Sequence, residues 1–176
     1  MNTQEQVDDY GQMTDGATLV IRRWLPGPAS RVWRYLTQSD LRRQWLASGE
    51  MRLEPDAPLE LVWRNDDLCH APDRRADTTP EESRLQSRVI SFQPERELKI
   101  AWNNGDVTFA LEEHGDRVLL TVTHTGLDDR DTRTKVAAGW HTHLDILVAK
   151  VKGTKGPSFW VTWNRLQAEY SQSLPR

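Results

Sequence analysis

The chain has 176 residues, with 26 acidic and 23 basic side chains for a net charge of −3, and a single cysteine. This length predicts one domain with its own core, and the scattered basic residues argue against nucleic acid or a membrane surface as a partner. One cysteine excludes intramolecular disulfides and thiolate zinc clusters, and without an apolar run of eighteen residues we expect a cytoplasmic protein with neither signal peptide nor membrane span.

The N-terminal part predicts a lead-in, a strand and two short helices. Residues 1–16 carry little apolar content, so we expect a flexible lead-in before a single domain over residues 17–176. Alternating apolar residues predict a strand over Thr18–Leu25. Helical spacing then predicts a helix over Ala29–Leu36, and a second short helix from Ser39 to Ala47.

The middle of the chain alternates with a period of two, which is typical of strands joined by short hairpins. The predicted strands are Glu50–Glu54, Leu59–Asn65, Arg84–Phe92, Glu97–Asn103, Val107–Glu112 and Arg117–Thr125. Between the second and third of these, the polar segment Asp66–Glu82 is too long for a tight turn. We expect it to be a mobile loop with few long-range contacts.

Helical periodicity returns at the C-terminal end. A long amphipathic helix is predicted from Asp131 to Val151, interrupted by Lys152–Pro157 and followed by a second helical stripe from Phe159 to Tyr170. This order of elements is α+β, with an antiparallel sheet of about six to seven strands whose apolar face needs a cover. The long C-terminal helix is the expected cover.

Four segments together resemble a known family. Pro28–Thr37, Leu41–Trp45, the stretch from Leu119 to Leu127, and Gly139–Trp140 are similar to bacterial homologues of the heat-shock protein 90 ATPase activator's C-terminal domain. That family belongs to the START-like, or helix-grip (SRPBCC), superfamily, and the resemblance covers roughly Thr18–Tyr170. It implies a curved sheet wrapped around the long helix.

The resemblance also implies a deep pocket between the sheet and that helix. Elsewhere in the superfamily this pocket holds lipids, sterols, polyketides and plant hormones. The chain has no room for the separate N-terminal domain with which the eukaryotic namesake binds its chaperone. The Asp66–Glu82 loop and the Gly153–Pro157 break are the segments expected to cover the pocket mouth.

Two histidines are the candidate polar groups of such a pocket. His124 shares a strand face with Val118, Leu120 and Val122, so it points toward the concave side, where it either serves a ligand or is a satisfied core histidine. His143 lies at the edge of the inward face of the long helix. His141 points elsewhere on that helix, so we expect no metal site.

Tryptophan provides 8 of the 14 aromatic residues, so large flat side chains must fill the interior or line a space in it. Periodicity places several of them on inward faces, where either core packing or a pocket lining is possible. The candidate pocket residues are Trp33, Trp63, Trp102, Phe109, Leu120, His124, Trp140, His143 and Leu144.

The sequence therefore predicts a protein that binds a small, largely apolar molecule of the lipid or polycyclic aromatic class, without a cofactor. One alternative is a chaperone-associated interaction module, with a possible chaperone or homodimer contact. A third possibility is a cyclase- or hydrolase-like enzyme that uses the same cavity. No nucleophile elbow, phosphate loop or pair of carboxylates in an apolar setting is present in the sequence.

Overall fold

The computed structural model describes residues 7–175 and contains one seven-stranded antiparallel sheet. The strands are β1 (Gln12–Met13), β2 (Leu19–Pro26), β3 (Pro58–Trp63), β4 (Ser83–Gln93), β5 (Glu97–Trp102), β6 (Gly105–His114) and β7 (Arg117–His124). Their order in the sheet is β1-β2-β7-β6-β5-β4-β3. The helices are α1 (Ala29–Thr37), α2 (Ser39–Arg42), the short 3₁₀ helix η1 (Asn65–Leu68), α3 (Arg130–Lys152) and α4 (Phe159–Ser173).

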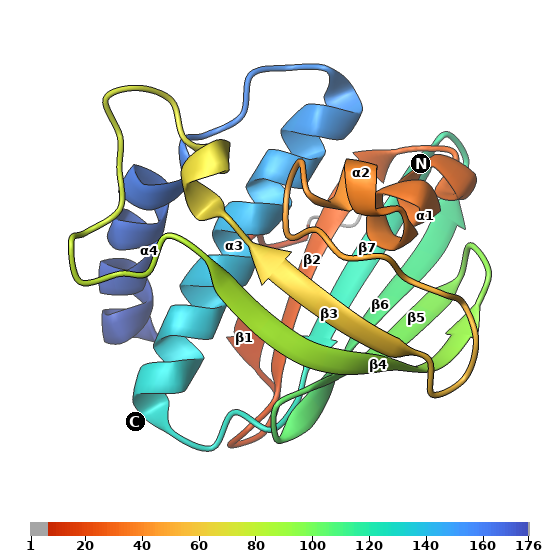
Figure 1. The fold of residues 1–176 in the computed structure, drawn as a ribbon, viewed down its shortest axis with the longest axis horizontal. Coiled ribbons are helices and arrows are strands. Elements are labelled where there is room, and N and C mark those ends of the chain that lie inside the picture. The colour runs from red at the N-terminus through yellow and green to blue at the C-terminus, as the bar shows by residue number, and fades with distance from the viewer. Residues whose placement is uncertain (1–6, 176) are drawn as a thin grey trace, which may run out of the picture.

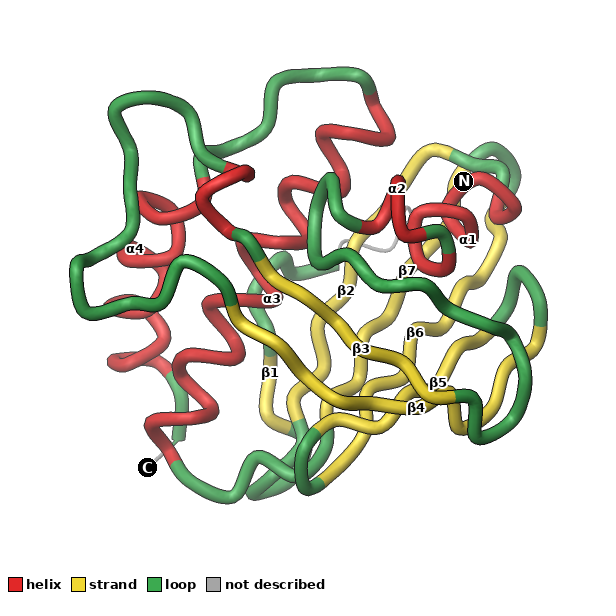
Figure 2. The backbone as a smooth tube through the Cα atoms, in the orientation of Figure 1, coloured by secondary structure: helices red, strands yellow, loops and turns green. Residues whose placement is uncertain are grey.

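The sheet curves and α3 passes across it, which is the helix-grip arrangement (Figure 1). The inward residues of the strands are Leu, Ile, Val and Phe at alternate positions, and they form one core with the buried face of α3. Helices α1 and α2 lie at the end of the sheet where β2 finishes, while α4 packs beside α3 (Figure 2). No helix within residues 7–175 is both long and apolar enough to cross a membrane.

The predicted strands of the meander are present with shifts of one or two residues at most ends, except for Glu50–Glu54, which forms no strand. Met51 and Leu53 pack against the core from an irregular segment, so the alternation reflects burial without a hydrogen-bonded neighbour strand. The second short helix is also shorter than predicted, because α2 ends at Arg42.

The lead-in differs from the expectation in its described part. Residues 1–6 lie outside the described residues, but Gln12–Met13 pairs with β2. The N–H of Gly11 donates to the hydroxyl of Tyr170 at 2.7 Å, and the ring of Tyr10 packs edge-on to His141 at 4.8 Å. These contacts join segments some 130 to 160 residues apart, which local periodicity does not reveal.

The expectation of few long-range contacts for Asp66–Glu82 is wrong. Asp73 accepts hydrogen bonds from the Ser158 hydroxyl at 2.6 Å and from the Val161 N–H at 3.2 Å, both at the start of α4. The Trp160 indole donates to Asp66 at 2.8 Å. The carboxylates of a polar loop can accept hydrogen bonds at the start of a helix instead of from water. Polar composition alone therefore does not distinguish an anchored loop from a mobile one.

Candidate functional site

An apolar cavity of about 110 Å³ lies between α3 and one end of the sheet, where strands β3, β5 and β7 finish. We call it the aromatic cavity, and it is lined by Leu46, Trp63, Trp102, His124, Val136, Gly139, Trp140 and His143. Trp63, Trp102 and His124 are the last residues of β3, β5 and β7. β3, β5 and β7 are every second strand of the antiparallel sheet, so all three run in the same direction. Their last residues therefore lie at the same end of the sheet.

Trp102 is the centre of the aromatic contacts around this cavity. Its ring lies 5.3 Å from Trp63, 5.2 Å from His124 and 5.5 Å from Trp140, measured between centroids. The interplanar angles of 50–67° are tilted or edge-on, as aromatic rings prefer. Trp140 also contacts Phe109 behind it at 5.7 Å, which anchors its ring to the core.

A hydrogen bond fixes His124 in the wall of the cavity. The indole N–H of Trp140 donates to Nδ1 of His124 at 2.9 Å. Burial lowers the pKa of His124 to about 4, although Asp106 opposes this shift, so the ring is neutral at pH 7. Because Nδ1 accepts, the neutral ring carries its proton on Nε2, which leaves that nitrogen as a donor.

His143 has the opposite tautomer. Its Nδ1 lies 2.7 Å from the Trp45 carbonyl oxygen, which can only accept, so Nδ1 carries the proton. Burial lowers the pKa of His143 to about 4, and the ring is neutral at pH 7. Its Nε2 is therefore an acceptor, so the two histidines among the lining residues differ at Nε2, which is a donor in His124 and an acceptor in His143.

A polar hollow of about 360 Å³ adjoins the aromatic cavity at the start of α3. The two spaces share Trp102, His124 and Val136 as lining residues. Apart from Gly126 and Leu127, the remaining lining of the hollow is polar or acidic: Asn103, Asn104, Asp128, Asp129 and Thr132.

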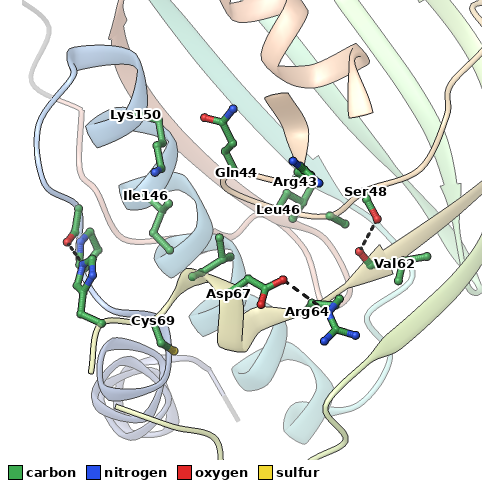
Figure 3. Close-up of a pocket in the computed structure, with 15 residues that line it drawn as sticks. Arg43, Gln44, Leu46, Ser48, Val62, Arg64, Asp67, Cys69, Ile146 and Lys150 are labelled. Carbon is green, nitrogen blue, oxygen red and sulfur yellow. Dashed lines mark hydrogen bonds and ion pairs between the residues drawn. The ribbon is translucent and has the colours of Figure 1, made fainter. Parts of the chain in front are cut away.

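A larger cleft of about 530 Å³ adjoins the cavity on its other side, with Leu46 as the shared lining residue. Figure 3 shows Lys150 and Ile146 of α3 along one side, with Arg43, Gln44 and Leu46 across from them. The rest of the lining is Ala47, Ser48, Val62, Arg64, residues 67–70 and the pair Gly156–Pro157. His70 joins these two segments, because its Nε2 lies 2.9 Å from the Gly156 carbonyl oxygen.

One face of α3 lines all three spaces. Thr132 and Val136 line the polar hollow, and Ile146 and Lys150 line the cleft. The aromatic cavity between them is lined by Val136, Gly139, Trp140 and His143 of the helix. These positions recur every three or four residues, which is the spacing of one helical face. The stripe spans about 27 Å at 1.5 Å per residue.

Five of the nine candidate residues meet at the aromatic cavity: Trp63, Trp102, His124, Trp140 and His143. The other four do not line it. Leu120 and Leu144 are fully buried in the core, Phe109 lies behind Trp140, and Trp33 packs into the core from α1. Sequence reasoning did not include Leu46, Val136 and Gly139 in the pocket, although Val136 lies on the same helical stripe as Trp140.

His141 and the neighbours Cys69 and His70 do not line the aromatic cavity. His141 faces the opposite side of α3, where Nδ1 lies 2.8 Å from the Tyr170 hydroxyl and Nε2 lies 3.5 Å from Asp145. The Cys69 thiol contacts the Asn65 carbonyl oxygen, whereas His70 turns to Gly156. The two neighbours are thus not aligned as a thiolate–imidazole pair.

Comparison with known proteins gives a consistent family. The model of the "Activator of Hsp90 ATPase homolog 1-like protein" family matches residues 26–152. A protein of Bordetella parapertussis, solved by solution NMR, is 32% identical with a TM-score of 0.77, covering 100% of this chain and 97% of its own. No curated protein matches this chain.

More distant structures share the fold. A conserved protein of unknown function from Enterococcus faecalis is 20% identical with a TM-score of 0.66, covering 92% of this chain and 87% of its own. CalU16 from Micromonospora echinospora, solved by solution NMR, is 18% identical with a TM-score of 0.65, covering 98% and 95% of the two chains.

The chain belongs to the activator of Hsp90 ATPase homolog 1-like family, and its fold is the START-like helix-grip fold. This fold is generally suited to ligand binding, because it sets a curved sheet against a long helix.

Proposed function

We propose that this member of the family binds a small, largely apolar molecule in the aromatic cavity. The observation that carries the proposal is the cavity itself, where three tryptophans surround unfilled space and two neutral histidines provide the polar groups. Small-molecule sites have this character, with mostly aromatic walls and a few placed polar atoms.

The volume limits what can enter. A cavity of about 110 Å³ is somewhat smaller than the engineered apolar cavity of about 150 Å³ that binds benzene, so one six-membered ring is the largest rigid group to expect inside. The adjoining hollow and cleft provide room for the rest of a larger molecule. The protein's own side chains fill most of the interface between the sheet and α3. The ligand therefore enters at the end of the sheet where the aromatic cavity lies.

Thermal unfolding with and without toluene tests the proposal, because a ligand that binds only the folded state raises Tm by mass action. We expect a saturable rise for the unaltered protein. Val136→Phe places a ring in the cavity wall and should abolish the rise. Val161→Phe makes the same change at a valine of α4 that is 59% exposed, and it should preserve the rise. Equal responses of the two variants, or no rise at all, would count against the proposal.

A further inference from the structure

The cleft beside the aromatic cavity contains cationic side chains that are not all neutralised. Arg64 is surrounded by Asp67, Glu81 and Glu82 at 3.6, 3.2 and 3.4 Å. Arg43 and Lys150 also line the cleft, and neither has an ion pair or a side-chain hydrogen bond with any residue in 7–175. The acidic residue of the lining, Asp67, is already paired with Arg64. The cleft therefore has two free positive charges.

These charges lie in line with the aromatic cavity. Lys150 follows His143 by seven residues on the same face of α3, a distance of about 10 Å along the helix axis. Ile146 lies between them, and Leu46 borders both spaces. A molecule with a ring in the aromatic cavity and a chain of about six carbons past Leu46 would bring its far end to Lys150 and Arg43.

The wall that carries Arg43 and Leu46 is held rigidly. The buried guanidinium of Arg42 donates to the carbonyl oxygens of Leu36 and Ala47, each at 3.1 Å, and to that of Gly49. His143 donates to the carbonyl oxygen of Trp45 at 2.7 Å. A preformed wall does not lose conformational entropy when a ligand binds, which favours affinity.

The opposite end of the α3 face has the opposite charge. The polar hollow contains Asp128 and Asp129, which would repel an anion. The charged lining residues therefore favour an anionic group at the cleft over one at the hollow.

Building on the function proposed above, we propose that the ligand is an anionic amphiphile, with its ring in the aromatic cavity and its carboxylate between Arg43 and Lys150. The apolar part supplies affinity through burial, and the charged part sets the orientation. Hydrogen bonds from charged donors to a carboxylate are stronger than those from neutral donors.

Binding of 6-phenylhexanoate and of 6-phenylhexan-1-ol, measured by isothermal titration calorimetry, tests this inference. The two probes share the ring and the chain, and only the first is charged at pH 7. We expect the acid to bind about three- to ten-fold more tightly, as two partly exposed ion pairs contribute. Arg43→Gln/Lys150→Gln should remove this advantage and leave the alcohol unaffected.

Lys152→Gln/Lys155→Gln is the matched control, because it removes the same charge from two exposed lysines outside the cleft. It should keep the preference for the acid. Equal affinity of the acid and the alcohol for the unaltered protein would overturn the inference and leave the proposed apolar site intact. Binding of neither probe would overturn both proposals.

A membrane surface is the other possible source of the anion. If sedimentation with phosphatidylglycerol vesicles depended on Arg43 and Lys150 while acid binding did not, the two cations would serve a membrane and the inference would be wrong. Acid binding that Val136→Phe leaves unchanged would also overturn it, because the ring would then lie outside the aromatic cavity.

Discussion

The indole nitrogen of Trp140 donates a hydrogen bond to Nδ1 of His124 across 2.9 Å, and both side chains are buried. This bond joins the middle of α3 to the end of β7, so it fixes the distance between helix and sheet where the aromatic cavity lies. It also decides the tautomer of His124. The histidine is thus a structural partner of Trp140 and part of the cavity wall at the same time.

His124→Leu should destabilise the protein, because it leaves the Trp140 N–H buried without an acceptor. The expected loss in the free energy of unfolding is about 1–3 kcal/mol, measured by urea denaturation. His124→Asn keeps an acceptor atom near the position of Nδ1 and should lose clearly less. A His124→Leu variant as stable as the unaltered protein would show that the hydrogen bond contributes nothing.

Stability should fall as the pH is lowered from about 6.5 toward 4. His124, His141 and His143 each have a pKa of about 4 in the folded protein, chiefly because of burial, against 6.5 for an exposed histidine. In this window the unfolded chain binds more protons, so acidification favours unfolding by up to about 1.4 kcal/mol per pH unit for each histidine. Burial raises the pKa of Asp145, which opposes the effect at the acidic end.

Urea denaturation at a series of pH values measures this slope. His124→Asn removes one of the three titrating groups and should reduce the slope by about a third. A free energy of unfolding that stays constant between pH 6.5 and 5 would contradict the neutral, buried state of these histidines.

Trp140→Ala should cost about 3–5 kcal/mol of unfolding free energy, because the ring is 3% exposed and packs on Trp102 and Phe109. Val161→Ala, at the exposed valine of α4, is the control and should change stability by less than about 0.5 kcal/mol. Chemical denaturation of both variants gives the comparison. A small loss at Trp140 would mean that the ring borders solvent more than protein.

Asp73→Ala should release the loop from α4. The carboxylate accepts from the Ser158 hydroxyl and the Val161 N–H, and these bonds hold its pKa below its usual value even though burial opposes the shift. By analogy with a lost helix cap we expect a cost of about 0.5–2 kcal/mol. Cys69 is half-buried in the same loop, so its labelling by a maleimide should become faster. Asp77→Ala, at an exposed position, should label at the original rate.

The strands of the meander could be predicted because apolar residues recur at alternate positions on the inward face of each strand. β6 is an example, with Val107, Phe109 and Leu111 buried and Thr108 and Ala110 less so. β1 could not be predicted, since two residues hold no period and their pairing depends on β2. Glu50–Glu54 shows the reverse error, because Met51 and Leu53 alternate in burial without a partner strand.

The candidate site could be predicted in part. Trp63, Trp102 and His124 could be predicted because each shares a strand face with apolar residues at alternate positions, and Trp140 and His143 because they lie on or beside the inward stripe of α3. The cationic cleft could not be predicted. Arg43 and Lys150 are more than a hundred residues apart, and on their own elements each looks like an ordinary exposed cation.

We expect apolar ligands to occupy the space that Trp63, Trp102 and Trp140 line. A toluene titration followed by ¹H–¹⁵N NMR of the tryptophan side chains tests it most directly, because each indole N–H gives its own signal. We expect saturable shifts for Trp63, Trp102 and Trp140, which line the cavity, and unchanged signals for Trp24 and Trp33, which do not. Shifts spread evenly over all indole signals, or no shift at Trp102 and Trp140, would contradict the claim.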